Sequence, residues 1–141
     1  MTEDGAEEEN ASMLMFPKEF EASETLLISE VRLLLEDKKQ RSEEADEDTE
    51  FNEVFNKTLS YCQTFSKYST KENMQAVRQL LTMQPSQPLH KFELAQLGNL
   101  VPDSAEDARA LIPSIQHKLT DEELEQLLDD LKAHVQSQVY Q

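Results

Sequence analysis

The side chains of this sequence that could perform chemistry are one cysteine, three histidines and many carboxylates. Cys62 has no second cysteine as a partner, and nothing near it in the sequence supplies a base. His90, His117 and His134 fall in three separate segments, so their spacing does not converge on one metal ion. No H-E-x-x-H, C-x-x-C, glycine-rich phosphate loop or nucleophile elbow occurs. The sequence therefore predicts no catalytic residue, metal or cofactor, and it argues against an enzyme.

Cys62 lies on the apolar face of a predicted helix. Large side chains recur on this face at spacings of four and three residues, the period of an amphipathic helix: Phe51, Phe55, Thr58, Cys62 and Phe65, with Val54, Tyr61 and Tyr68 beside them. We expect a structural cysteine, because buried cysteines behave as small hydrophobic residues. A single cysteine also excludes a disulfide framework and fits a reducing compartment, the cytosol or the nucleus. His90 precedes an apolar helix and is expected to cap it or to lie at the surface.

The remaining patterns predict an all-α fold, since the chain has two glycines and few β-branched residues. Helices are expected from about Ser23 to Lys39, from Phe51 to Phe65, from Ser69 or Thr70 to before Pro85, from Leu89 to before Pro102, from Ser104 to before Pro113, and from Thr120 to Val135. Thr120 and Glu123 have the spacing of a capping box. Gly98 lies inside a helix at a cost of up to ~1 kcal/mol against alanine, which predicts a close helix crossing there.

The net charge of −16 is concentrated in three clusters of carboxylates. Residues 1–10, 43–50 and 121–130 hold 17 acidic and no basic side chains, which leaves 12 acidic against 13 basic residues elsewhere. The first two clusters are typical of a solvated tail and a loop, and the third of the wet side of an amphipathic helix. The nearly neutral body lacks the basic stripe of nucleic-acid binding. No membrane-spanning run or apolar signal core is found, which predicts a soluble intracellular protein.

The widest apolar surface is predicted between residues 13 and 35. At ~100° per residue, seven aliphatic side chains cover an arc of roughly 220°, about twice the stripe that packing on one core requires: Leu26, Leu27, Ile28, Val31, Leu33, Leu34 and Leu35. This helix is either the central helix of the chain's own bundle, or part of its apolar arc packs against a partner protein. We favour the second interpretation. Residues 13–20 are interrupted by Pro17 and would suit an edge strand added to another protein's sheet.

The sequence thus divides into four predicted regions. Residues 1–12 are expected to be a disordered acidic tail, and residues 13–40 a partner-binding, strand-like segment followed by the first helix. Residues 41–50 are expected to be a flexible acidic loop, and residues 51–141 a helical bundle. No internal repeat and no sustained heptad seam is visible.

Four sequence segments resemble one family in their order along the chain: Phe16-Pro17-Lys18-Glu19-Phe20, Leu89-His90-Lys91-Phe92-Glu93-Leu94-Ala95, Ala110-Leu111-Ile112-Pro113-Ser114, and Asp121-Glu122-Glu123-Leu124 continuing to Leu128-Asp129-Asp130. They are similar to the fourth-largest subunits of eukaryotic DNA-directed RNA polymerase II. The likeness spans about residues 13–135. Departures lie in the acidic tail, the loop at 42–50, the stretch 83–88 and the extreme C-terminus.

The resemblance implies an HRDC-like helical bundle with an extended N-terminal segment, in a non-catalytic stalk subunit. Such a subunit pairs with the seventh polymerase subunit near the RNA exit channel and supports initiation and transcript-linked steps. The implied partners are the seventh subunit and the polymerase core, with nucleic acid bound mainly through the partner, and no membrane or small-molecule substrate. By position, the implied partner-binding residues are Met13, Leu14, Met15, Phe16, Phe20, Leu27, Val31 and Leu34. The implied location is the nucleus, with shuttling to the cytoplasm left open.

Two other functions remain open from the residues alone. A free-standing acidic adaptor or histone chaperone would use the carboxylate clusters, and its binding would weaken steeply with salt. A weak RNA-binding module would use the helical surface, although the aromatic residues fall at core spacing with few cations beside them.

Overall fold

The computed structural model describes residues 8–45, 50–84 and 87–136, and every regular element in these ranges is helical. The elements in chain order are η1 (Ala11–Met13), α1 (Lys18–Ala22), α2 (Ile28–Glu44), α3 (Glu53–Phe65), α4 (Lys71–Thr82), α5 (Lys91–Leu100), α6 (Ala105–Leu111), η2 (Pro113–Ile115) and α7 (Asp121–Gln136). The prediction of an all-α fold is confirmed. Within these ranges, no helix is both long and apolar enough to cross a membrane.

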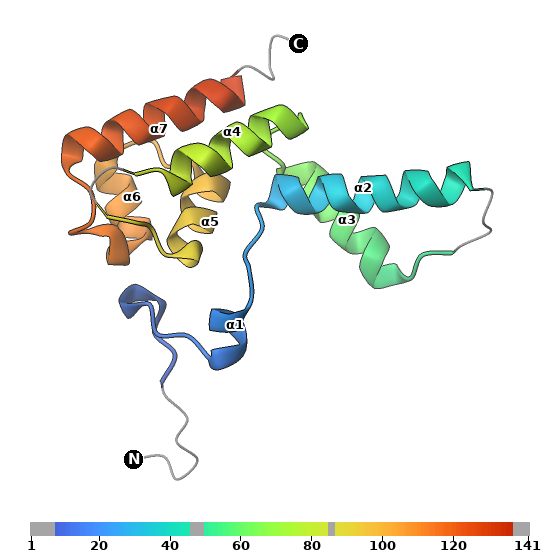
Figure 1. Ribbon diagram of the computed structural model, residues 1–141, viewed down its shortest axis with the longest axis horizontal. Coiled ribbons are helices and arrows are strands. Elements are labelled where there is room, and N and C mark those ends of the chain that lie inside the picture. Colours follow the sequence, from blue (N-terminus) through green and yellow to red (C-terminus); the bar gives the residue numbers. More distant parts are fainter. Residues whose placement is uncertain (1–7, 46–49, 85–86, 137–141) are drawn as a thin grey trace.

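The helices form two parts, a bundle and a projecting hairpin (Figure 1). Helices α4, α5, α6 and α7 pack together as the bundle, whereas α2 and α3 pair with each other and extend away from it. The expected bundle over residues 51–141 is therefore too wide, because α3 belongs to the hairpin. Helix α1 lies beside the bundle, on the side away from α7 (Figure 1).

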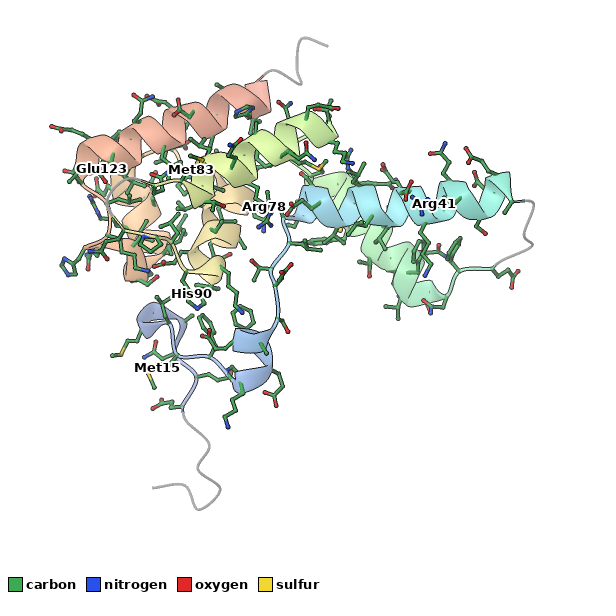
Figure 2. The ribbon with its side chains drawn as sticks, viewed as in Figure 1. Met15, Arg41, Arg78, Met83, His90 and Glu123 are labelled. Carbon is green, nitrogen blue, oxygen red and sulfur yellow. The ribbon has the colours of Figure 1, made fainter. Side chains whose placement is uncertain are left out.

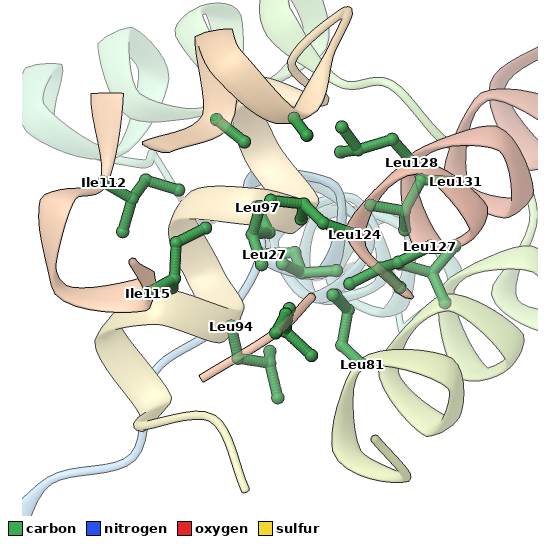
Figure 3. Packing of buried hydrophobic residues seen from close by; sticks show 14 of the residues in the cluster. Leu27, Leu81, Leu94, Leu97, Ile112, Ile115, Leu124, Leu127, Leu128 and Leu131 are labelled. Carbon is green, nitrogen blue, oxygen red and sulfur yellow. The ribbon is translucent and has the colours of Figure 1, made fainter. Parts of the chain in front are cut away.

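One hydrophobic core fills the bundle (Figure 3). Its buried side chains come from α4 to α7, from η2, and from four residues outside these helices: Leu27, Tyr68, Met74, Val77, Leu81, Leu94, Leu97, Ala105, Ala108, Ile112, Ile115, Leu119, Leu124, Leu127, Leu128 and Leu131. Leu27 is 0% exposed and lies in the middle of this cluster. The residue directly before α2 thus belongs to the bundle core, while most of α2 itself lies outside.

Gly98 makes room for Leu27 in the core. A Cβ atom at position 98 would lie 2.6 Å from Leu27 Cδ2 and 3.2 Å from Leu81 Cδ1, and the first distance is a clash. A close helix crossing was expected at Gly98, but the nearest atom belongs to the side chain of Leu27, which precedes α2, and Leu81 of α4 comes second. The Tyr68 hydroxyl also donates a 2.7 Å hydrogen bond to the Gly98 carbonyl.

Side-chain caps define where the bundle helices begin. The Thr70 hydroxyl accepts from the Asn73 N–H and the Ser104 hydroxyl from the Asp107 N–H, both at 3.1 Å. Thr120 accepts from the Glu123 N–H at 3.1 Å at the start of α7. These caps satisfy backbone donors that a helix leaves unpaired in its first turn. The predicted N-terminal ends of α4, α6 and α7 are confirmed.

The first long helix differs from the prediction at both ends. It was expected over 23–39, but α2 spans Ile28–Glu44. Residues 23–27 stay extended because groups elsewhere bind their backbone: Lys91 Nζ donates to the Ser23 carbonyl and Arg78 donates to the Thr25 carbonyl. The Asn99 side chain then accepts from the Ile28 N–H at 2.9 Å, where the helix begins. Leu26 and Leu27 therefore precede the helix, and the apolar arc of α2 is narrower than expected.

Two regions expected to be unstructured are partly ordered. Residues 41–44 continue α2, where Arg41 pairs with Asp37 one turn earlier at 3.0 Å. Residues 10–12 belong to a turn that is closed by a bridge between Asn10 and Met15. The rest of the predicted tail up to residue 7, and residues 46–49 of the predicted loop, lie outside the described residues.

Candidate partner-binding surface

The segment before α1 is a compact turn, and the extended edge strand expected over 13–20 is wrong. Asn10 and Met15 exchange both backbone hydrogen bonds, at 3.0 and 2.9 Å, around the η1 turn. Leu14 completes the turn in the left-handed region, with φ of 56°. Residues 18–22 then form α1, for which Pro17 supplies the extended N-cap. The turn leaves Met13 exposed at its tip.

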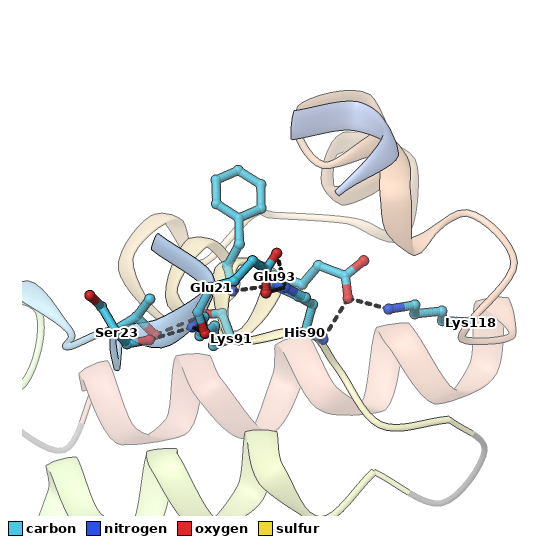
Figure 4. A network of polar contacts seen from close by, with 8 residues as sticks. Glu21, Ser23, His90, Lys91, Glu93 and Lys118 are labelled. Atoms are coloured by element: carbon cyan, nitrogen blue, oxygen red, sulfur yellow. Dashed lines mark hydrogen bonds and ion pairs between the residues drawn. The ribbon is translucent and has the colours of Figure 1, made fainter. Parts of the chain in front are cut away.

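Aromatic side chains hold this segment against the beginning of α5. The Phe16 ring lies 4.5 Å from the Phe20 ring, 5.0 Å from Phe92 and 5.4 Å from His90, between ring centroids. Lys91 adds hydrogen bonds to the backbone carbonyls of Glu21 and Ser23 (Figure 4). Aromatic pairs at these distances are worth about 0.5–1.5 kcal/mol each beyond their buried area. Phe16 and Phe20 thus have neighbours within the chain and are half-buried.

A buried serine joins the α2–α3 hairpin to the bundle. Ser29 Oγ accepts from the backbone N–H groups of Lys67 and Tyr68, both at 3.1 Å, and lies 2.8 Å from Ser66 Oγ. Arg32 donates to the carbonyls of Tyr68 and Ser69 at 3.2 and 2.9 Å. These bonds satisfy the backbone where the chain leaves α3 for the bundle, so they define the direction of the hairpin.

Glu30 and Arg78 form a second link between the hairpin and the bundle. Arg78 donates from Nη2 to Glu30 Oε1 at 2.6 Å and from Nε to Glu30 Oε2 at 2.8 Å, a two-point pairing. Glu30 also accepts from the Leu27 N–H at 2.7 Å, as the cap of α2. Burial by itself raises the pKa of the Glu30 carboxyl, but the hydrogen bonds from Arg78 and Leu27 outweigh it, and the pKa lies below its usual 4.5.

We expect this link to be lost in acid. Because the pKa of Glu30 is lowered in the folded state, its contribution is present above about pH 4.5 and disappears as the pH falls through the folded-state pKa. Arg78→Met should therefore lower the free energy of unfolding near about pH 7, and lower it by less near about pH 3, where more of Glu30 is protonated and the hydrogen bond of Arg78 to the Thr25 carbonyl is still lost. Arg41→Met, which breaks an exposed pair with Asp37, is the control and should change little at either pH. Urea titrations at both pH values measure this, and an equal effect of Arg78→Met at both would contradict it.

The hairpin exposes apolar side chains on both of its helices. On α2, Leu34 is 57% exposed, and on α3 Val54, Tyr61 and Phe65 are each more than half exposed. The α3 residues recur at spacings of seven and four and so lie along one face, with Tyr61 and Phe65 in contact at 4.7 Å between ring centroids. Contiguous exposed apolar side chains are typical of interaction surfaces, so this face of α3 is a candidate site.

Sequence reasoning placed the α3 face incorrectly. It assigned Phe65 and Thr58 to the buried seam, whereas Leu59 and Cys62 are the buried residues of α3, and Thr58 and Phe65 are exposed. The sequence did contain a signal of the exposed face, the apolar stripe of Val54, Tyr61 and Phe65. Because α3 is apolar on two sides and only one side can face α2, the other side must be exposed.

The eight residues predicted to bind a partner fall into three groups. Met13 and Leu34 are exposed, and Leu27 is fully buried in the chain's own core. The rest are half-buried: Leu14, Met15, Phe16, Phe20 and Val31. Leu27 is therefore the wrong residue for a partner surface, because its side chain fills the space over Gly98. The structure brings Leu14, Met15, Phe16 and Phe20 together in the N-terminal segment, and places Val31 and Leu34 apart from them on the hairpin.

Cys62, His90 and His134, which could in principle perform chemistry, have structural roles. Cys62 is buried between α3 and α2, and burial raises the pKa of its thiol, as expected of a structural cysteine. His90 is the N-cap of α5, where its Nδ1 accepts from the Phe92 N–H at 3.0 Å, which confirms the expected cap. His134 Nδ1 lies 3.1 Å from Asn73 Oδ1. Across the described parts of the chain, no three or more His, Cys, Asp or Glu side chains are grouped to hold a metal.

The carboxylates of α7 also support the fold. Glu125 accepts from the Ala105 N–H at 2.8 Å and so caps α6 from outside, and Asp121 pairs with Arg109. Arg109 in turn donates to the Leu119 carbonyl at 3.0 Å. The acidic cluster at 121–130 is thus partly engaged within the bundle.

The structure thus defines a class: an all-α protein with a helical bundle and a projecting helical hairpin, on which Leu34, Val54, Tyr61 and Phe65 are exposed. The profile of the RNA polymerase Rpb4 family matches residues 25–135.

Several relatives cover nearly the whole chain. The DNA-directed RNA polymerase II subunit rpb4 of Dictyostelium discoideum is 39% identical, with 89% of this chain and 88% of that protein aligned. The subunit rpb4 of Schizosaccharomyces pombe is 38% identical over 88% and 90% of the two chains. Subunit 4 of Arabidopsis thaliana is 39% identical over 90% and 94%. The chain belongs to the RNA polymerase Rpb4 family.

Proposed function

We propose that this chain is a non-catalytic subunit that pairs with the seventh subunit of RNA polymerase II to form the stalk near the RNA exit channel. It acts in the nucleus, where it supports initiation and transcript-linked steps by holding its partner and offering docking surfaces. Nucleic acid is bound mainly through the partner. The bundle of α4 to α7 is proposed to be of the HRDC-like type.

The observation that carries this proposal is the exposed apolar surface of the α2–α3 hairpin. Leu34, Tyr61 and Phe65 are large side chains that are a little more than half exposed, so burying the remainder of each against another protein would contribute about 1–1.5 kcal/mol. Met13, at the tip of the N-terminal turn, is a further exposed contact. Leu27 is removed from the proposed surface. Val31 remains a half-buried candidate on the hairpin, and Leu14, Met15, Phe16 and Phe20 remain half-buried candidates in the separate N-terminal segment.

The test places charges on the hairpin surface. Leu34→Asp combined with Tyr61→Asp should weaken pairing with the seventh subunit at least ~100-fold, because an aspartate buried without a partner at an interface is strongly unfavourable. The hairpin should remain helical, since both side chains are more than half exposed. The two subunits are co-expressed and co-purified at high salt, and the dissociation constant is then measured by titrating one isolated subunit with the other.

Leu111→Asp is a matched control on the bundle. Leu111 is 56% exposed against 57% for Leu34, and it lies at the end of α6, so this change should leave the pairing intact. Unchanged pairing of the hairpin double variant would reject the proposed interface. If the affinity of the wild-type chain for its natural partners falls steeply as the salt concentration rises, an acidic adaptor explains its binding better.

A further inference from the structure

A groove runs between α4 and α7 on the outside of the bundle. Two adjoining hollows of about 450 and 420 Å³ form it, and they share Leu80, Met83 and Asp130. Ala76 and Ala133 line one end, and Leu127 lies in the wall of the other. The two helices run side by side in opposite directions (Figure 1), so the walls of the groove are two helix faces. We refer to it as the α4–α7 groove.

The apolar part of the groove ends at a methionine that is open to water. Met83 follows directly after α4 and is 68% exposed, at the same end of the helix pair as Glu123 (Figure 2). From Ala76 to Met83 the groove follows ~10 Å of helix, or about two turns. Methionine is flexible and polarizable, and it is over-represented on surfaces that accommodate apolar side chains of other proteins.

The rim of the groove carries negative charge. Glu122, Glu123 and Asp130 line it, and no lysine or arginine occurs among its described lining residues. Gln126 donates to Asp130 Oδ1 at 3.0 Å and holds that carboxylate in place. The acidic residues 1–10 and 43–50 add to a chain of net charge −16. Such a rim repels nucleic acid and acidic peptides and attracts cationic side chains.

We propose that the α4–α7 groove binds an amphipathic helical segment of a partner protein. Its apolar side chains, spaced three or four residues apart, enter the groove beside Leu80 and Met83, and its flanking lysine and arginine side chains pair with Glu122 and Asp130. A groove between two helices that is about two turns long accepts this kind of ligand, because a helix presents side chains three, four and seven residues apart on one face.

The α4–α7 groove is separate from the surface proposed for the seventh subunit. Helices α4 and α7 lie on one side of the bundle, and the N-terminal segment with α1 lies on the other (Figure 1). The hairpin extends away from the bundle to one side. A basic helix can therefore occupy the groove while the hairpin is paired, and the two surfaces can be tested independently.

The test is selection of helical peptides from a displayed library on the complete chain, followed by fluorescence anisotropy with the enriched peptides. Enriched sequences should carry apolar residues at spacings of three or four with flanking lysine or arginine. Met83→Glu should weaken their binding about tenfold or more. Glu122→Gln with Asp130→Asn should weaken it several-fold at low salt and less at high salt.

Met13→Glu is the matched control, because Met13 is also a methionine that is 68% exposed but lies in the N-terminal turn. It should leave peptide binding unchanged, and Met83→Glu should leave pairing with the seventh subunit unchanged. The proposal is overturned if no peptide is enriched, if enriched peptides are acidic, or if Met83→Glu binds them as well as the wild type. A chain that self-associates in light scattering, and loses this with Met83→Glu, would mean that a second copy occupies the groove.

Discussion

Leu27→Asp is expected to unfold the bundle of α4 to α7 in the absence of any partner. Leu27 is 0% exposed and packs over Gly98 and against the other core leucines. The change removes a buried leucine, which costs about 2–5 kcal/mol when the replacement is alanine. It also places a carboxylate in an apolar core, which costs several kcal/mol more unless the group is neutralised. The sum rivals the whole stability of a typical domain, about 5–15 kcal/mol.

Circular dichroism and urea unfolding of the isolated chain measure this effect. The adjacent Leu26→Asp is the control, since Leu26 is 45% exposed and surface changes usually stay within about 0.5 kcal/mol. A Leu27→Asp variant as stable as Leu26→Asp would mean that Leu27 is not in the core. The prediction also separates folding from binding, because a loss of partner in this variant would follow from unfolding.

Lys118→Met is expected to lower the free energy of unfolding by about 3 kcal/mol. Glu93 is 0% exposed, and its Oε1 accepts from Lys118 Nζ at 2.6 Å and from the His90 N–H at 2.8 Å. Its Oε2 accepts from Ser114 Oγ at 2.6 Å (Figure 4 shows Glu93 between Lys118 and His90). Removing the lysine leaves a buried carboxylate without its counter-ion, and breaking a buried pair from one side costs about 3–5 kcal/mol.

A second change in the same variant tests the cause. Glu93→Gln added to Lys118→Met should recover part of the loss, because an amide keeps an acceptor for the His90 N–H and a donor for Ser114 without a charge. Lys57→Met is the control, since among the described residues Lys57 pairs with the exposed Glu53 one turn earlier, and such pairs contribute little. Urea titrations of the wild type, the two single variants and the double variant give the free energies of unfolding to be compared. If the double variant is less stable than Lys118→Met alone, the charge of Glu93 is not what the lysine compensates.

The first prediction concerns how the N-terminal half is held to the bundle, and the second concerns the beginning of α5, next to which that half packs. Leu27 is the last residue before α2, and Glu93 lies in the first turn of α5, where Lys91 and His90 contact the segment around α1. The proposed partner surface is therefore supported by the bundle core, although its exposed side chains lie outside it.

The sequence by itself determined most of the local structure. Low glycine content, the 3.6-residue period and the caps Thr70, Ser104 and Thr120 predicted an all-α chain with the bundle helices in place, because these signals act within a few residues of the backbone. The absence of motifs with catalytic or metal-ligand spacing directed the interpretation toward binding. The four ordered segments indicated the family that the comparisons then showed.

Only the tertiary structure decided which apolar face meets which. A period marks an apolar face but not its neighbour, so Leu27 was assigned to a partner when it fills the space over Gly98, and Phe65 to the core when it is exposed. The beginning of α2 depended on Arg78, Lys91 and Asn99, residues 48 to 71 positions away that bind the backbone or caps near residue 28. Such contacts are set by packing between distant segments, which no local pattern in the sequence encodes.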